Sequence, residues 1–185
     1  MTMPERQTFL HNWSTPLLRV VDRSRQPRWG CKGPAAASWL QGQGIPIPPG
    51  SNSWIRDGAW AVYRLGRSEF LLEAEEFCIQ SLRQSIRQDS VYPVWHDGAA
   101  LLLEGRGVPS LLRQICSVDF TALALDTRPV VLTSMMGVSV IAVPEADLQK
   151  ISLWFDGSYS HYFQEMLEKI VPDLSLSDFH VLRGL

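Results

Sequence analysis

The residue types that could carry out chemistry are dispersed along this sequence. Its four histidines lie far apart, and no HxH or HxxxH spacing joins any two of them: they are His11, His96, His161 and His180. Metal sites usually need ligands at such short spacings or in other compact clusters. A serine nucleophile of the α/β-hydrolase type would need a GxSxG turn, which the sequence lacks. The sequence therefore predicts neither a metal site nor catalytic residues.

The cysteines give no sign of a disulfide framework. Cys31, Cys78 and Cys116 are odd in number, far apart, and form no CxxC pair. Cys31 lies within an expected strand and Cys116 on the apolar face of an expected helix. We therefore interpret both as core thiols rather than as low-pKa nucleophiles. Reduced, unpaired thiols are typical of a cytoplasmic protein, which is the expected location.

Three residues around one predicted turn are the candidates for cofactor or ligand binding. The carboxylate of Asp57 could accept hydrogen bonds from an amine or a pterin, and Trp54 and Trp60 could stack on a flat ligand. A structural alternative stands beside this one, because an aspartate before a glycine commonly forms a turn. The two tryptophans could equally belong to the core or to a protein interface.

A strand, a tight turn and a helix are predicted over residues 28–40, RWGCKGPAAASWL. Gly33 can adopt backbone angles that other residues resist, and Pro34 suits the first position of a helix. Free N–H groups at that helix start, beside Lys32, could hold an anion. However, neither GxGxxG nor GKS/T is present, which favours a structural turn. The same plan returns at residues 100–112, where Gly105 stands 72 positions after Gly33.

Hydrophobic periodicity gives the remaining elements. Strands are expected at residues 17–21 (as an edge strand), 29–32, 59–65, 69–74, 100–103, 138–143 and 151–155. Helices are expected from about residue 34 to residues 42–44, over residues 75–88, over residues 108–116, and from an N-cap at Ser158 to Pro172, with residues 45–53 as a loop. The last helix should bury the stripe Tyr159, Tyr162, Phe163, Met166, Leu167 and Ile170.

Each half of the chain thus reads β-α-β-β-α, which predicts an α+β fold built by internal duplication. We expect a single domain over residues 1–185, with pseudo-repeats at about residues 28–88 and 99–171. Residues 1–14 are expected to form a loosely ordered arm.

The overall composition excludes several classes of partner. The 185 residues are 45% hydrophobic and carry a formal charge of −2, with no basic run, so nucleic acid is not expected as a partner. No segment has the length and purity of a signal peptide or a membrane span, and no membrane association is expected. Seven tryptophans are many for this length, and tryptophan is favoured in interface hot spots.

Two stretches of the first half, RWGCKGPAAASWL and WAVYRLGRSEFLLE, resemble the gamma subunit of heterotetrameric sarcosine oxidase. The second half resembles it over ALLLEGRGVPSLLRQICSVDF, VVLTSMMGVSVIAV and ISLWFDGSYSHYFQEML. Arg106 stands where that family often has a proline after the glycine. The likeness spans residues 20–171, and it implies the folate-binding fold of the glycine cleavage aminomethyltransferase and of YgfZ.

The resemblance also implies a function. This chain would be a non-catalytic, structural subunit of a complex that oxidatively demethylates sarcosine or a related N-methyl amine. Its partners would be alpha, beta and delta subunits, and those would hold the FAD or FMN, the NAD and the tetrahydrofolate. The alternative is a free-standing folate-binding or aminomethyltransferase-like protein. Asp57 lies one or two residues from the place of the aminomethyltransferase catalytic aspartate, so that role is not transferred to it.

Overall fold

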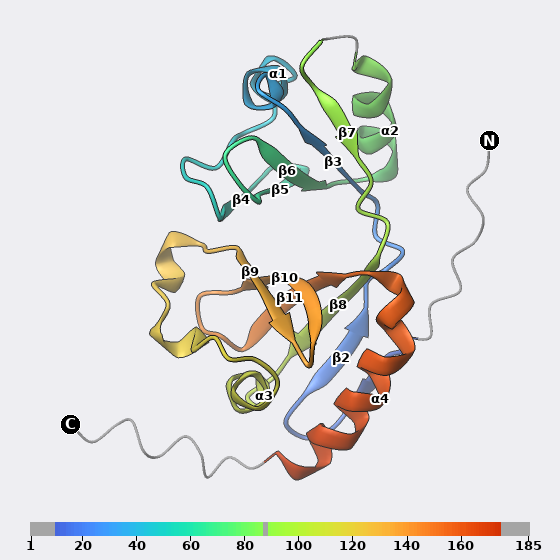
Figure 1. Cartoon of the computed structure of the whole chain (residues 1–185), viewed down its shortest axis with the longest axis vertical. Coiled ribbons are helices and arrows are strands. Elements are labelled where there is room, and N and C mark those ends of the chain that lie inside the picture. The colour runs from blue at the N-terminus through green and yellow to red at the C-terminus, as the bar shows by residue number, and fades with distance from the viewer. Residues whose placement is uncertain (1–9, 87–88, 175–185) are drawn as a thin grey trace. The chain divides into compact units, whose positions relative to one another are not determined.

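The computed structural model describes residues 10–86 and 89–174, which contain two β-sheets and four α-helices (Figure 1). This part of the chain forms two compact units. The first unit contains residues 25–97 and 124–132, and the second unit contains residues 10–24, 98–123 and 133–174. Among the described residues, no helix has the length and apolar character needed to cross a membrane.

The first unit is built on a five-stranded antiparallel sheet in the order β4-β5-β6-β3-β7. Its elements are β3 (Arg28–Lys32), α1 (Ala36–Gly42), β4 (Ser53–Asp57), β5 (Trp60–Arg64), β6 (Glu69–Glu73), α2 (Glu76–Ser85) and β7 (Tyr92–Val94), with the 3₁₀ turn η2 (Leu125–Thr127). The predicted hairpin is confirmed as β5 and β6. Strands β4 and β7 were not predicted: β4 follows directly on the proline-rich loop, and β7 carries a proline, which sheets tolerate at their edges.

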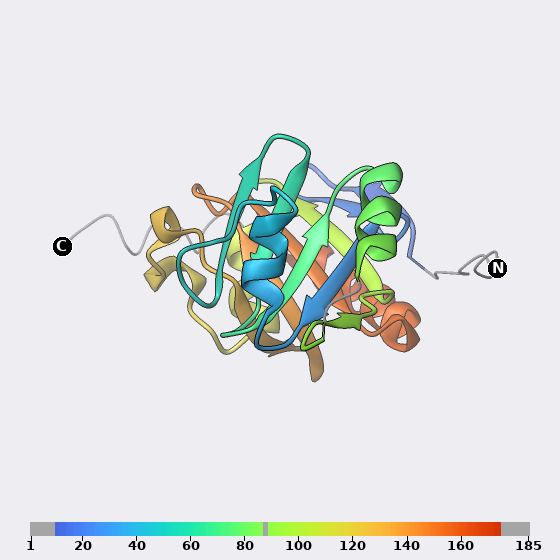
Figure 2. The same cartoon turned by 90° about the horizontal axis from the view of Figure 1, so that it is seen from above.

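One face of this sheet forms the core of the first unit. Trp29 pairs with Leu72 and Cys31 with Phe70, so apolar side chains of β3 and β6 share one face. Both helices, α1 and α2, cover that face (Figure 2). The ring of Trp39 in α1 meets that of Trp29 edge-on, with centroids 6.2 Å apart. Burial of this apolar surface is the main stabilising term for the unit.

The second unit has a six-stranded sheet in the order β1-β2-β8-β11-β10-β9. Its elements are β1 (Trp13–Ser14), β2 (Arg19–Asp22), β8 (Ala99–Glu104), α3 (Val108–Ile115), β9 (Val131–Met135), β10 (Val138–Pro144), β11 (Lys150–Phe155) and α4 (Ser160–Ile170), with the 3₁₀ turns η1 (Phe120–Ala122), η3 (Gly157–Tyr159) and η4 (Val171–Asp173). The predicted helix at residues 108–116 and the second hairpin, β10 and β11, are confirmed.

Three details of the second unit correct the sequence-based expectations. β2 is an interior strand rather than an edge strand, because β1 pairs with its outer side. That pairing places Trp13–Ser14 in the sheet and not in a loose arm, while residues 1–9 lie outside the described residues. In α4 only Phe163 and Leu167 of the expected stripe are fully buried, whereas Tyr159 and Tyr162 are 48% and 41% exposed.

The two units repeat the same turn at Gly33 and Gly105. The backbone φ angles are +130° and +131°, a region that side chains with a Cβ rarely adopt. A Cβ would also collide with the carbonyl oxygen of Ser90 at the first position and of Leu17 at the second. Each glycine therefore lets a helix start close against the segment that leads into a neighbouring strand.

The strands that follow Leu17 and Ser90, which are β2 and β7, are exchanged between the two repeats. β2 precedes the first repeat but pairs with β8 of the second, and β7 precedes the second repeat but pairs with β3 of the first. Each repeat therefore has the element order β-β-α-β-β-β-α rather than the simpler β-α-β-β-α. The first strand of each repeat pairs in the sheet of the other repeat. Whether the chain unfolds as a single domain stays a prediction.

Candidate functional site

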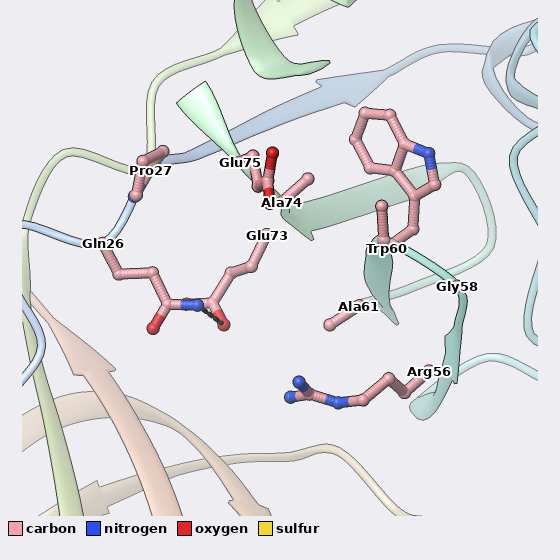
Figure 3. A pocket seen from close by; sticks show the side chains of 10 residues that line it. Gln26, Pro27, Arg56, Gly58, Trp60, Ala61, Glu73, Ala74 and Glu75 are labelled. Atoms are coloured by element: carbon pink, nitrogen blue, oxygen red, sulfur yellow. Dashed lines mark hydrogen bonds between the residues drawn. The ribbon is translucent and has the colours of Figure 1, made fainter. Parts of the chain in front are cut away.

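An open cleft of about 310 Å³ lies in the first unit (Figure 3). It forms where β3 begins, β6 ends, and the β4–β5 hairpin turns. The loop before β3, the hairpin and the end of β6 all contribute residues to its wall: Gln26, Pro27, Arg56, Gly58, Ala59, Trp60, Ala61, Glu73, Ala74 and Glu75. Its volume is at the lower end of the range of small-molecule pockets.

Glu73 is the buried polar group of this cleft. Only 3% of the residue is exposed, and it closes β6 directly after the buried Phe70, Leu71 and Leu72. Its Oε2 accepts a hydrogen bond from the Tyr63 hydroxyl and another from Nε2 of Gln26, each at 3.2 Å. In the register of β3 and β6, Arg28 lies directly opposite. Such partners are needed because a buried carboxylate without them is strongly unfavourable.

The rest of the wall combines one aromatic ring with charged groups. The half-buried indole of Trp60 packs partly against the core of the first unit, and the guanidinium of the exposed Arg56 points into the cleft (Figure 3). Glu75 is also exposed and lies at the N-cap of α2. In the register of β4, β5 and β6, Arg56 and Glu73 lie on the face that carries Ala61, whereas Trp60 lies on the opposite face and packs against the core.

The three residues singled out from the sequence are separated by the structure. Trp60 lines the cleft, whereas Trp54 and Asp57 do not. The ring of Trp54 instead lies 6.0 Å from that of Tyr63 and beneath the guanidinium of Arg128, 5.6 Å away. Asp57 is exposed, pairs with Trp60 in the register of the hairpin, and precedes Gly58 at φ +54°. Asp57 is therefore the last residue of β4 and stands directly before the hairpin turn.

The helix start after Lys32 is also structural. The N–H of Gly33 donates to the Ser68 carbonyl at 3.0 Å, that of Ala35 to the Ser90 carbonyl at 3.3 Å, and that of Ala36 to Gly33 at 3.0 Å. These three backbone N–H groups at the helix start are therefore bonded within the protein.

In the part of the chain that the structure describes, the thiols and imidazoles are not gathered into one cluster. Burial raises the pKa of the Cys31 thiol to about 12, and it lowers the pKa of His96 to about 4, with the Arg28 charge adding to the effect. The exposed ring of His161 lies 3.9 Å from the Glu165 carboxylate. Within residues 10–86 and 89–174, no cluster of three or more His, Cys, Asp or Glu is arranged to hold a metal ion; His180 lies outside them.

Sequence reasoning missed Glu73, Gln26 and Arg56. The available signal was the glutamate after the apolar run Phe70–Leu72 of EFLLE, which alternation places on the same face as Leu71. Gln26 and Arg56 gave no signal of their own, because polar residues in a loop and on a short strand are common.

The sequence matches no protein-family model, and no curated protein is significantly similar to it. The structure does match known proteins. One is a chain of the heterotetrameric sarcosine oxidase from Corynebacterium sp. U-96, solved in complex with pyrrole 2-carboxylate. The TM-score is 0.67 at 18% identity, and the match covers 82% of this chain and 84% of that chain.

A second match is the glycine cleavage system aminomethyltransferase T from Bartonella henselae, with a TM-score of 0.62 at 12% identity. It covers 84% of this chain but only 46% of that one, so the present chain spans less than half of the aminomethyltransferase. The chain therefore has the duplicated α+β fold that these two proteins share, as its motifs predicted.

Proposed function

We propose that this chain is a structural, non-catalytic subunit of a heterotetrameric flavoenzyme of the sarcosine oxidase type, in the position of the gamma subunit. The assembly would oxidatively demethylate sarcosine or a related N-methyl amine. Its alpha, beta and delta subunits would hold FAD or FMN, NAD and tetrahydrofolate, the last as acceptor of the one-carbon unit. This chain would contribute surface and shape rather than a reacting group.

The observation that carries the proposal is the match in size as well as in fold. Similar shares of both chains, 82% and 84%, are covered by the match to the sarcosine oxidase chain, so the two chains are of similar length. A chain of this length that resembles one chain of a four-subunit enzyme is a natural candidate for the equivalent place in a related assembly.

Exposed aromatic residues of the first unit support a role in assembly. Phe77 is 80% exposed and lies on the face of α2 opposite the buried Ile79 and Leu82. Trp95, 53% exposed, lies beside the same helix, with the Arg83 guanidinium 4.4 Å from its ring. Aromatic and arginine side chains are the types most enriched at the centres of protein interfaces.

The chemistry of the described residues agrees with a structural role. The Cys31 thiol is buried and its pKa is raised to about 12, so it would not form a thiolate nucleophile near neutral pH. The buried Glu73 already accepts hydrogen bonds from Tyr63 and Gln26. Both groups are buried within the first unit.

Co-expression tests the proposal. A tagged form of this chain would be produced together with the alpha, beta and delta subunits of a sarcosine-oxidase-type enzyme from the same cell. Affinity purification followed by light scattering should recover a four-component complex that contains flavin. A chain that stays monomeric in the presence of all three partners would contradict the proposal.

A charge variant refines that test. Phe77→Glu should weaken assembly by at least about tenfold, since it places a charge in a desolvated aromatic contact. Gln114→Glu, which adds the same charge on an exposed position of α3, is the matched control and should assemble normally. Equal assembly of both variants would show that Phe77 lies outside the interface. The proposal that the chain is a subunit would still be decided by the co-expression test.

The match to aminomethyltransferase T favours a second candidate, a free-standing folate-binding protein. Of the three candidate ligand-binding residues from the sequence, Trp60 lines the cleft and Asp57 and Trp54 do not. Titration of tetrahydrofolate against tryptophan fluorescence separates the two functions. Saturable quenching by the isolated chain would favour folate binding, and its absence would favour the structural subunit.

A further inference from the structure

The sequence contains three aspartate–glycine pairs, Asp57–Gly58, Asp97–Gly98 and Asp156–Gly157, and the structure places them in different surroundings. In such a pair the aspartate side chain can react with the backbone nitrogen of the glycine, which no Cβ shields. We propose that Asp57–Gly58 is the pair that rearranges spontaneously in the folded chain, and that the product is an isoaspartyl linkage. This modification does not depend on the assembly proposed above.

The rearrangement needs no reactant other than water. The backbone nitrogen of Gly58 attacks Cγ of the protonated Asp57 carboxyl group, and the new N–Cγ bond closes a succinimide ring. The proton of the N–H leaves with the carboxyl hydroxyl as water. A second water then adds to the main-chain carbonyl carbon of Asp57 and breaks its bond to the Gly58 nitrogen. The chain now continues through Cβ and Cγ, the former carbonyl is a free carboxylate, and no electron is transferred.

Asp57–Gly58 lies at the open tip of the β4–β5 hairpin. Asp57 ends β4, and its pairing with Trp60 is the last pair of the ladder. Residues 56–59 are all exposed, and a Cβ built on Gly58 would meet nothing within 4 Å. Within the described residues, the Gly58 N–H donates no backbone hydrogen bond. The nitrogen and Cγ must approach to about 3–3.5 Å, and opening this one terminal pair permits it at low cost.

Packing protects Asp97–Gly98. A Cβ built on Gly98 would collide with the carbonyl oxygen of Phe155, so the backbone here lies directly against the end of β11. The next residue, Ala99, pairs with the same Phe155 in the ladder of β8 and β11. The backbone rotation that brings the glycine nitrogen to the aspartate side chain would break this close contact. The reaction is therefore slow at this pair while the second unit stays folded.

A hydrogen bond protects Asp156–Gly157. Oδ1 of Asp156 accepts the N–H of Ser158 at 2.8 Å and so caps the 3₁₀ turn η3. Hydrogen bonds from the backbone and side chain of Ser158 lower the pKa of this carboxyl group. Asp156 therefore stays ionised and held in place, whereas the reaction needs a free, protonated carboxyl group whose hydroxyl can leave.

The product would change the wall of the cleft in the first unit. Gly58 and Ala59 of the same turn both line that cleft. An isoaspartyl linkage adds one backbone carbon before Gly58 and places a new carboxylate on the turn. The pairing of Asp57 with Trp60 would then lose its register, because side-chain atoms have become part of the main chain.

Peptide mapping of the aged full chain tests the inference. Trypsin places the three aspartates in separate peptides, residues 57–64, 88–106 and 151–169. The chain is kept near neutral pH for several weeks in water enriched in heavy oxygen, which marks each aspartate whose ring has opened. We expect isoaspartate to form in peptide 57–64 at least about tenfold faster than in the other two. In urea, where only neighbours along the chain differ, the three rates should agree within about threefold.

Two variants check which residue reacts. Asp57→Glu lengthens the side chain by one carbon, so attack by the backbone nitrogen would need a larger and less favourable ring. This variant should leave peptide 57–64 free of heavy oxygen. Asp126→Glu makes the same change at another exposed aspartate of the first unit, one that a threonine follows. It should isomerise at Asp57 as fast as the unaltered chain does.

Either of two results would overturn the inference. One is isoaspartate that forms in the folded chain at Asp97 or Asp156 as fast as at Asp57. The other is a folded chain whose Asp57 gains neither isoaspartate nor heavy oxygen over the incubation, which would mean that the hairpin tip stays closed. Neither result bears on subunit assembly, which is measured by co-purification.

Discussion

The Tyr63 hydroxyl donates a hydrogen bond to Oε2 of Glu73 over 3.2 Å, between two neighbouring strands of the first unit. Both residues are buried. Because Glu73 also accepts from Gln26, its carboxyl group stabilises the junction of β5, β6 and the loop before β3. Loss of one donor from a buried acceptor costs more than the average hydrogen bond contributes.

Tyr63→Phe should therefore lower the free energy of unfolding by about 1–3 kcal/mol, since Glu73 loses a partner and stays buried. Urea denaturation followed by circular dichroism measures the change. Tyr92→Phe is the matched control, because more than half of Tyr92 is exposed, and it should change stability by less than about 0.5 kcal/mol. Similar losses in the two variants would show that the bond to Glu73 is unimportant.

Gly33→Ala and Gly105→Ala should each destabilise the protein by at least about 2 kcal/mol. The reason is the same at both sites: a positive φ and a collision of Cβ with a backbone carbonyl. Gly42→Ala in α1, where a Cβ meets nothing within 4 Å, should instead be stabilising by up to about 1 kcal/mol. Thermal unfolding of the three variants gives the comparison. A tolerated alanine at either of the first two sites would contradict the structural equivalence of the turns.

His96 should make the protein less stable in mild acid. Its folded pKa is lowered to about 4 from 6.5, mainly by burial, then by the Arg28 charge, with Asp97 opposing. The unfolded chain therefore binds the proton more readily between these values, so the contribution is fully present above pH 6.5 and is lost as pH falls toward 4. The loss amounts to at most about 3 kcal/mol.

Urea denaturation at several values between about pH 7 and pH 4 measures this dependence. His96→Gln should flatten it, whereas His161→Gln, at an exposed position, should leave it unchanged. If the free energy of unfolding of His96→Gln depends on pH as that of the unaltered chain does, other groups cause the acid sensitivity.

Cys31 should resist thiol reagents in the folded protein. It is buried and its pKa is raised to about 12, while Cys78 and Cys116 are half-buried. Iodoacetamide at about pH 8, followed by mass spectrometry, should label the latter two at least about tenfold faster. In urea all three should react alike. Fast labelling of Cys31 under native conditions would show that its strand opens readily.

Local patterns in the sequence determined much of the fold. The spacing of Val108, Leu111, Leu112 and Ile115 fixes an amphipathic helix, and the structure buries all four residues. The recurrence of glycine at positions 33 and 105 identified the duplication. Both positions follow a strand and need a positive φ angle, which glycine adopts most easily. Such features depend on neighbours along the chain, which the sequence displays directly.

Tertiary structure alone decided the exchange of β2 and β7 and the chemistry of the cleft. β2 and β8 are far apart in sequence, and nothing local specifies that partner. Tyr159 and Tyr162 lie on an apolar stripe yet stay exposed, because the packing of α4 buries only a narrower face around Phe163. Glu73, Gln26 and Arg56 meet only once three separate segments are assembled, and burial of a carboxyl group is a property of that assembly rather than of residue type.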